Sequence, residues 1–255
     1  MRAAATLQRE YYERTAHLYD AEHVREGDEH YVALKHISGF FDVLGISSVL
    51  DVGCGTGRGM QYFLRNRPGV AVRGVEPIAA LMEQAVNANA IPAGLIQQGS
   101  GESLPFADRT FDAAFECGVL HHVKDPNRIV REMMRVSRKA VFLSDENRFA
   151  HGSLFARWAK LLLCKAGVFR GAYRLKTLGK GYRFSEGDGL AYSYSVFDSC
   201  AVLSEWADRV ILIPTDDVKA TSVFHPLLTS FHVLLCAVRD GDDSNASARN
   251  EGLKR

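Results

Sequence analysis

A glycine-rich stretch directly after a short apolar run is the first part of the sequence whose residue types could bind a ligand. The run Val49 to Val52 is typical of a buried strand, and glycines follow it at every second position: Gly53, Gly55, Gly57 and Gly59. Because glycine lacks a Cβ atom, such a loop tolerates positive φ and lets the backbone approach a ligand closely. The pattern predicts a cofactor-binding turn, although a tight strand-to-helix turn without a ligand would have the same composition.

An acidic residue at the end of the next apolar run narrows the class of ligand. The run Val70 to Val75 predicts a second strand that ends at Glu76, whose carboxylate can accept hydrogen bonds from both hydroxyls of a ribose. The dinucleotide pattern G-x-G-x-x-G is not complete, because its third glycine would fall on Arg58 or Met60. No lysine-bearing phosphate loop follows the first strand. The sequence therefore favours a nucleoside ligand over a nucleoside triphosphate.

Three segments in this order resemble the class I S-adenosylmethionine-dependent methyltransferases of the ubiquinone-biosynthesis-like branch, the type 11 methyltransferase domain. They are DVGCGTGRG from Asp51, GVEP from Gly74 and GESLPFADRTFDAAFECGVLHHV from Gly101. The resemblance covers roughly residues 8 to 144. It implies that the chain is an enzyme that uses S-adenosyl-L-methionine and transfers a methyl group to a small-molecule acceptor. We expect the acceptor atom to be a hydroxyl oxygen.

The resemblance also implies which residues contact the cofactor. Asp51 and the glycines would face the methionine part, Glu76 the ribose, and the segment around Ser100 to Glu102 the adenine. The expected cofactor-binding residues are Tyr11, Tyr19, Asp51, Gly53, Cys54, Gly55, Gly57, Glu76, Pro77, Ser100, Gly101, Glu102, Glu116 and Cys117. Two positions depart from the family pattern. Ser100 replaces an aspartate that accepts from the adenine amino group, and residues 136–140 replace a proline-glycine-glycine turn.

The alternation of short apolar runs with amphipathic helical patterns predicts a parallel sheet with right-handed crossovers. We expect an α/β, Rossmann-like sheet of seven mostly parallel strands with an antiparallel last strand, helices on both faces, and an insertion after the fifth strand. Residues 1–240 would form a single methyltransferase domain, with residues 1–28 covering the cofactor and residues 148–196 forming an insertion or lid on the acceptor side. Residues 241–255 are expected to be a disordered tail.

Candidate catalytic residues follow the predicted strands, because ligands of parallel sheets bind at the carboxyl ends of the strands. His121 could take a proton from a hydroxyl acceptor at neutral pH, whereas the resemblance favours a structural or cofactor-positioning role for His121 and His122. Glu146 would orient an acceptor, and His225 would reach it from the loop between the last two strands. No metal is expected, since His17, His23, His30 and His36 are not one helical turn apart.

Composition limits the partners of this chain. The formal net charge is +1, from 31 basic and 30 acidic residues, so no global field favours nucleic acid or an anionic membrane. Five cysteines without a C-x-x-C pair predict reduced thiols and a cytoplasmic location. No signal peptide or integral membrane segment is expected, because no apolar run approaches the roughly 18 residues that a spanning helix needs.

Two alternatives stay open from the sequence alone. The amphipathic stretch Ser153 to Phe169 is compatible with a lid on an apolar substrate, a homodimer face or a membrane-surface helix, and core or dimer packing is the preferred interpretation. For the function, the alternatives are a nucleotide-dependent oxidoreductase or epimerase and a nonenzymatic cofactor-binding partner module. The first is disfavoured by the incomplete glycine pattern and by the lack of a Tyr-x-x-x-Lys pair.

Overall fold

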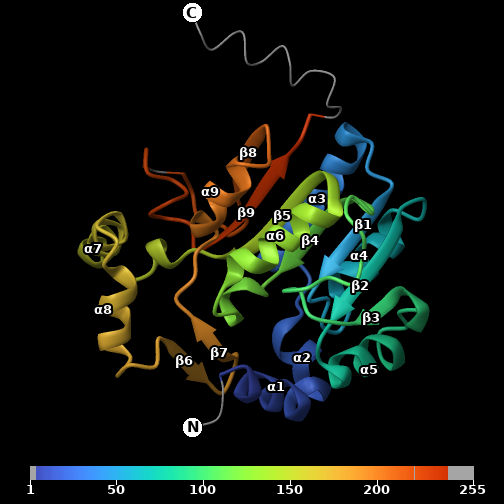
Figure 1. The fold of residues 1–255 in the computed structure, drawn as a ribbon, viewed down its shortest axis with the longest axis horizontal. Coiled ribbons are helices and arrows are strands. Elements are labelled where there is room, and N and C mark those ends of the chain that lie inside the picture. Colours follow the sequence, from blue (N-terminus) through green and yellow to red (C-terminus); the bar gives the residue numbers. More distant parts are fainter. Residues whose placement is uncertain (1–3, 221, 241–255) are drawn as a thin grey trace, which may run out of the picture.

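The computed structural model describes residues 4–220 and 222–240, which form a seven-stranded sheet with helices on both faces (Figure 1). In the order β3-β2-β1-β4-β5-β9-β8, every neighbouring pair outside β9 is parallel, and β9 is antiparallel to both β5 and β8. The strands are β1 (Ser48–Val52), β2 (Ala71–Glu76), β3 (Ile96–Gln98), β4 (Phe111–Cys117), β5 (Ser137–Glu146), β8 (Arg209–Pro214) and β9 (His232–Val238). The predicted fold class is confirmed; the predicted tail at 241–255 lies outside the described residues.

Alternate residues of each strand face two hydrophobic cores, one on each side of the sheet. Helices α3, α4 and α5 pack on one side and α6 and α9 on the other. The bounds are α3 (Glu29–Leu44), α4 (Arg58–Asn66), α5 (Ala79–Asn87), α6 (Pro126–Val136) and α9 (Cys200–Ser204). Local sequence sets the ends of α3: the Asp28 side chain accepts from the Tyr31 N–H, and Gly45 ends the helix at φ 60°. Packing on both sides of the sheet holds the carboxyl ends of the strands in place.

The insertion after β5 contains two helices and a hairpin. These are α7 (Leu154–Lys165), α8 (Phe169–Lys176), β6 (Tyr182–Ser185) and β7 (Gly189–Tyr192), between the short turns η4 (Arg148–Ala150) and η5 (Val196–Ser199). The single helix expected from 153 to 169 is interrupted at Gly167, which adopts φ 72°. The hairpin was not predicted. Among the residues that the structure describes, no helix has the length and apolarity needed to cross a bilayer.

The N-terminal segment lies along the hairpin of the insertion, as Figure 1 shows for α1 and β7. It consists of α1 (Ala4–Thr15), the short turn η1 (Ala16–Leu18) and α2 (Tyr19–His23). The Tyr11 hydroxyl donates to the backbone oxygen of Glu186 at 3.0 Å, and the Tyr11 ring meets that of Phe184 edge to face. Two segments distant in sequence therefore meet beside the carboxyl ends of β1 and β4.

Candidate active site

The glycine-rich loop after β1 borders a cavity at the carboxyl end of the sheet. The backbone N–H groups of Gly53 and Cys54 both donate to the Val75 oxygen, which bends the chain away from β1. The cavity is lined by Tyr19, Asp51, Gly53, Cys54, Gly55, Thr56, Arg58, Gly59 and Cys117. The structure thus brings the predicted loop, one residue of the N-terminal segment and the end of β4 to one place.

The glycines of this loop have different physical roles. At Gly55 the backbone has φ 54°, and an added Cβ would meet nothing within 4 Å. At Gly59, in the first turn of α4, an added Cβ would lie 2.6 Å from both Asp51 Oδ2 and the Phe115 ring. Gly59 is therefore required by packing, whereas Gly55 presents open backbone to the cavity side.

These two glycines give a paired prediction. We expect Gly59→Ala to lower the free energy of unfolding by about 1 to 3 kcal/mol, because the methyl group overpacks the core. Gly55→Ala should cost about 1 to 2 kcal/mol through its left-handed backbone alone, yet weaken S-adenosylhomocysteine binding at least tenfold. Urea denaturation and titration calorimetry of both variants test this. Unchanged binding by Gly55→Ala would mean that the loop is only a turn.

Two buried carboxyl groups stand next to the loop. Glu76 accepts from the Gly55 N–H and the Ile78 N–H, both at 2.9 Å, which leaves lone pairs on each oxygen for a ligand. Burial raises the pKa of Glu76 to about 7, against the effect of these two N–H groups. Burial, with the nearby Glu76 charge, raises the pKa of Asp51 to about 8. Among the described residues, no cation is in hydrogen-bond contact with either carboxyl group, although the charge of Arg58 opposes the shift of Asp51.

The N-terminal segment is tied across the loop by polar contacts that the sequence did not reveal. Asp20 accepts from the Thr56 hydroxyl at 2.5 Å and from the Asn89 amide at 2.6 Å. Arg58 donates to Asp28 at 2.7 Å. The cavity beneath this segment measures about 20 Å³, close to the volume of one water molecule. In this arrangement the cavity is smaller than a nucleoside.

Except for Cys117, the remaining predicted cofactor residues lie outside the lining of this cavity. Ser100 is exposed and accepts from the Glu102 N–H at 3.2 Å, while the Glu102 carboxylate lies 3.6 Å from Arg128. Pro77 is exposed and precedes α5. Gly101 packs near Val52 and Ile129, Gly57 faces Ile91, Tyr11 contacts the hairpin, and Cys117 is in the lining.

Glu116 is fully buried at the end of β4. Its Oε2 accepts from the Val119 N–H at 2.9 Å, and its Oε1 has no hydrogen-bond partner within the described part of the chain. Burial, together with the charge of Asp145, raises the pKa of Glu116 well above its ordinary value. Burial thus disfavours the charged form of Glu116, whose Oε2 holds the turn after β4.

A buried histidine and aspartate join the ends of β4 and β5. The short turn η3 (Leu120–His122) places His121 Nδ1 at 2.7 Å from Asp145 Oδ1, and Asp145 Oδ2 accepts from the Leu120 N–H at 2.8 Å. The Glu146 N–H also donates to Asp145, at 2.6 Å. Burial opposes the charge of Asp145, but His121 and these donors outweigh it and lower the pKa of Asp145. The ionised carboxylate fixes the His121 ring with Nε2 turned away from it.

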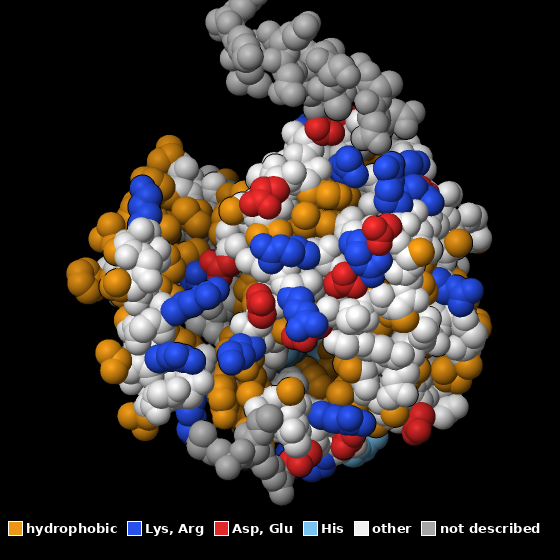
Figure 2. Space-filling view, viewed as in Figure 1, with side chains coloured by type: hydrophobic (Ala, Val, Ile, Leu, Met, Phe, Trp, Pro, Cys, Tyr) orange, Lys and Arg blue, Asp and Glu red, His pale blue; other side chains and the backbone are white. Residues whose placement is uncertain are grey.

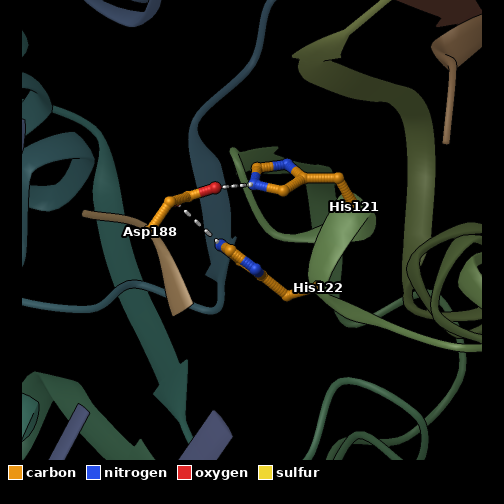
Figure 3. Close-up of side chains that lie close together, drawn as sticks. All are labelled: His121, His122 and Asp188. Carbon is orange, nitrogen blue, oxygen red and sulfur yellow. Dashed lines mark ion pairs between the residues drawn. The ribbon is translucent and has the colours of Figure 1, made fainter. Parts of the chain in front are cut away.

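Asp188, in the turn of the insertion hairpin, faces both histidines (Figure 3). Its oxygens lie 3.6 Å from His121 Nε2 and 3.6 Å from His122 Nε2. Burial opposes the charge of His121, but Asp145 and Asp188 outweigh it and raise its pKa well above the ordinary value. Burial and the neighbouring His121 charge lower the pKa of His122 to about 4. The charged form is therefore favoured on His121 and disfavoured on His122.

The ligand-type atoms of His121, His122 and Asp188 lie within 4.8 Å of one another, a spacing that a metal ion could bridge. Hydrogen bonds already account for both nitrogens of His122. Nδ1 lies 2.6 Å from the Leu190 oxygen, and the Tyr12 hydroxyl lies 3.0 Å from Nε2. We therefore interpret these residues as an ion-pair and hydrogen-bond network.

The other two candidate catalytic residues lie apart from this network. Glu146 is half-buried beyond Asp145, and burial raises its pKa while the His121 charge opposes this shift. His225 lies in the loop between β8 and β9, where its Nδ1 is 2.7 Å from the Thr229 hydroxyl. In the described part of the chain, neither makes a hydrogen bond or ion pair with His121 or with the residues that line the cavity. Among the three candidates, His121 has the arrangement of a base.

Comparison with known proteins gives a family for the motif-bearing segment. Residues 50–143 match the family described as methyltransferase domain. Over 94 residues the chain is 42% identical to an uncharacterized methyltransferase of Mycobacterium sp. strain JLS, covering 37% of this chain and 36% of that protein. It is 35% identical over 94 residues to the O-methyltransferase resE of Aspergillus sclerotiorum, covering 35% of each. The chain thus aligns with about a third of the length of these curated relatives.

Solved structures extend the likeness to the whole fold. A structure from Thermotoga maritima, described as a methyltransferase that uses S-adenosylmethionine and a possible histamine N-methyltransferase, covers 90% of this chain and 99% of its own. Its TM-score is 0.57 at 16% identity, which supports the fold alone. The CurJ carbon methyltransferase has a TM-score of 0.54 at 18% identity and covers 82% of this chain and 54% of its own. Residues 50–143 thus match the methyltransferase domain family, and the fold of the chain resembles that of solved methyltransferases.

Proposed function

We propose that this enzyme transfers a methyl group from S-adenosyl-L-methionine to a hydroxyl oxygen of a small molecule. The observation that carries the oxygen assignment is the contact of His121 Nδ1 with Asp145 at 2.7 Å, which leaves Nε2 directed toward the insertion. An imidazole held in this way can accept a proton from a hydroxyl group, and the carboxylate stabilises the imidazolium that forms. The O-methyltransferase resE among the relatives is in line with this proposal.

The residues around the glycine-rich loop suit this cofactor. Glu76 keeps acceptor capacity for the two hydroxyls of a ribose, and Gly55 has open space above its backbone. When bound, S-adenosylmethionine supplies an electrophilic methyl group, so the protein needs mainly to orient the acceptor and exclude water. Tyr19 and the N-terminal segment would exclude water from above the loop.

His121 would act after the acceptor hydroxyl replaces Asp188 as the neighbour of Nε2. The present distance of 3.6 Å between Nε2 and Asp188 is longer than a good hydrogen bond, so the ion pair is loose. Where His121 is neutral, its Nε2 would take the proton of the acceptor hydroxyl as the oxygen forms its bond to the methyl carbon and the bond from that carbon to sulfur breaks. S-adenosylhomocysteine would leave, and Asp145 would hold the ring throughout. His225 and Glu146 are proposed only as contacts of the acceptor.

The first test is transfer of a labelled methyl group from S-adenosylmethionine to a mixture of hydroxylated, amino and carbon-acid metabolites. We expect the label on oxygen; label found only on nitrogen or carbon would reject the acceptor assignment. Thermal-shift measurements with S-adenosylhomocysteine and NAD distinguish the methyltransferase from the oxidoreductase alternative. The oxidoreductase alternative predicts that NAD stabilises the protein.

The matched variant for cofactor binding is Glu76→Gln. It keeps the shape but loses one acceptor oxygen and the charge, so we expect S-adenosylhomocysteine affinity to fall about tenfold to a hundredfold. Because a ribose diol favours the ionised carboxylate, wild-type affinity should rise as pH increases through about 7, the pKa of Glu76. Calorimetry across this pH range measures both effects. Equal S-adenosylhomocysteine affinities of the wild type and Glu76→Gln would mean that Glu76 does not contact the cofactor.

A further inference from the structure

The insertion has a charge distribution unlike that of the rest of the chain. Residues 148–185 contain nine lysines and arginines and no aspartate or glutamate, whereas the whole chain has a formal net charge of +1. The remainder of the chain is therefore net negative. Six of these nine side chains are exposed: Lys165, Arg170, Arg174, Lys176, Lys180 and Arg183. The insertion thus concentrates positive charge on one part of the molecule.

The three other cations of this segment are held internally. Arg148 pairs with Asp198, and Arg157 donates to the Gly152 and Leu228 oxygens at 2.8 Å. Lys160 donates to the His151 oxygen at 2.8 Å. These contacts hold α7 against the rest of the fold. The exposed cations of α8 and the hairpin follow α7 in the chain.

Large apolar side chains protrude between the exposed cations. Within the described part of the chain, neither α7 nor α8 contains a buried residue. The exposed apolar side chains here include Leu154, Phe155 (84%), Trp158, Leu162, Val168, Leu175, Leu178 (90%) and Phe184. On α7, Leu154, Trp158 and Leu162 are four residues apart and form one stripe. Contiguous exposed apolar surface of this kind marks an interaction site.

The loop before β9 continues this stripe. Phe224 meets Trp158 edge to face with ring centroids 4.9 Å apart, and the neighbouring Val223 is 94% exposed. Figure 2 shows the result at the left of the molecule, where apolar and basic side chains gather over α7 and α8. Apolar and cationic groups therefore share one surface, which we call the insertion surface: α7, α8 and residues 223–224.

We propose that the insertion surface docks on an anionic phospholipid bilayer. Cations near such a bilayer are attracted to its negative headgroups, and protruding leucine and phenylalanine side chains gain by entering the boundary of the acyl chains. The positive charge of the insertion surface favours an anionic bilayer over a second copy of the chain. In a symmetric dimer the same patch would meet itself and bring like charges together, which is unfavourable. Nucleic acid would use the cations but not Leu154, Phe155 or Leu162, because phosphate contacts are polar.

The insertion surface is linked to the candidate active site through the chain. Helix α8 leads directly into β6, and the turn between β6 and β7 carries Asp188, which faces His121 and His122. Docking would therefore place the lipid surface beside the hairpin that borders the acceptor side. The docking itself does not depend on the proposed methyl transfer, so it can be tested without a known acceptor.

The test is flotation of the full chain with vesicles of phosphatidylcholine alone and vesicles in which about a third of the lipid is phosphatidylglycerol. We expect binding to the second kind only, weakening as salt is added. The triple variant Arg170→Gln, Arg174→Gln, Lys176→Gln should lower the partition coefficient about a hundredfold, since each cation contributes a factor of about five. Phe155→Ser should lower it about tenfold or more.

The matched control is Lys35→Gln, Arg65→Gln, Arg131→Gln, which removes three exposed cations from α3, α4 and α6. It should leave the partition coefficient within about threefold of wild type. An equal loss in this control would mean that only net charge matters, and equal binding to both vesicles would reject the proposal. A dimer that Phe155→Ser dissociates would instead assign the surface to a second copy. Displacement from vesicles by single-stranded RNA at low micromolar concentration would favour nucleic acid.

Discussion

Replacing His121 with asparagine should lower the rate of methyl transfer by about a hundredfold to ten-thousandfold, the usual contribution of a positioned base. Binding of S-adenosylhomocysteine should stay within about threefold of wild type, because His121 is not in the lining of the cavity beside the glycine-rich loop. The measurement is the initial rate of labelled methyl transfer to the acceptor identified first. A variant that keeps full activity would exclude His121 as the base.

The pH dependence separates a base from a structural histidine. A base must be neutral before the reaction, so activity should rise with pH through the pKa of His121, which Asp145 and Asp188 raise. Asp188→Asn removes one of these carboxylates, so the rising limb of the profile should move to lower pH. Asp145→Asn should also lower the pKa of His121, as a nuclear magnetic resonance titration would show, and should reduce the rate. A profile that moves in neither variant would leave His121 only a structural role.

The sequence contained enough information for the sheet and the cofactor loop because both depend on local patterns. Short apolar runs fixed the strands, and the glycines after Val52 fixed the turn into α4. The distinction between Gly55 and Gly59 was not available, since it depends on Phe115, which is brought near only by the pairing of β1 with β4. A glycine pattern predicts a loop but not which glycine faces a ligand.

The polar contacts around the site were predicted poorly because they join distant segments. Asp188 reaches His121 only through a hairpin, and its sequence neighbours Gly187 and Gly189 indicate a turn without indicating where the turn points. Asp20 was overlooked for the same reason, although an aspartate near the start of a short helix is a common partner for a loop hydroxyl. The contact of the Tyr12 hydroxyl with His122 also joins distant segments and was not predicted.

The start of β5 departs from the sequence pattern of the family, yet the strand still forms there. Residues 136–140 lack the proline-glycine-glycine turn of the family pattern, and β5 already begins at Ser137. Arg138 and Lys139 lie in this first part of the strand, where both are close to Asp112, at 3.1 Å and 3.7 Å. A pattern based on glycine and proline does not predict these ion pairs.

Replacing Asp51 with asparagine should stabilise the protein without ligand while impairing the cofactor site. Burial raises the pKa of Asp51 to about 8 from an ordinary 3.8, so the folded state is destabilised by ionisation as pH rises between these values. The neutral amide removes this cost. The gain in unfolding free energy should be close to zero near pH 4 and reach about 5 kcal/mol near pH 9. Urea denaturation at both pH values, with S-adenosylhomocysteine binding measured alongside, tests both parts.

Asp112→Asn is the matched control, because this buried carboxyl group at the start of β4 is shifted in the opposite direction. Burial opposes its charge, but hydrogen bonds from Ser47 and the cations Lys139 and Arg138 outweigh burial and lower its pKa to about 2. Its ionised form therefore stabilises the fold above about pH 4, and this stabilisation is lost as pH falls through about 2. Asp112→Asn should cost about 2 kcal/mol at neutral pH, where Asp51→Asn gains. If both variants destabilised the protein equally near pH 9, the carboxyl group at Asp51 would not be held against ionisation, and its proposed role at the cofactor would need another physical basis.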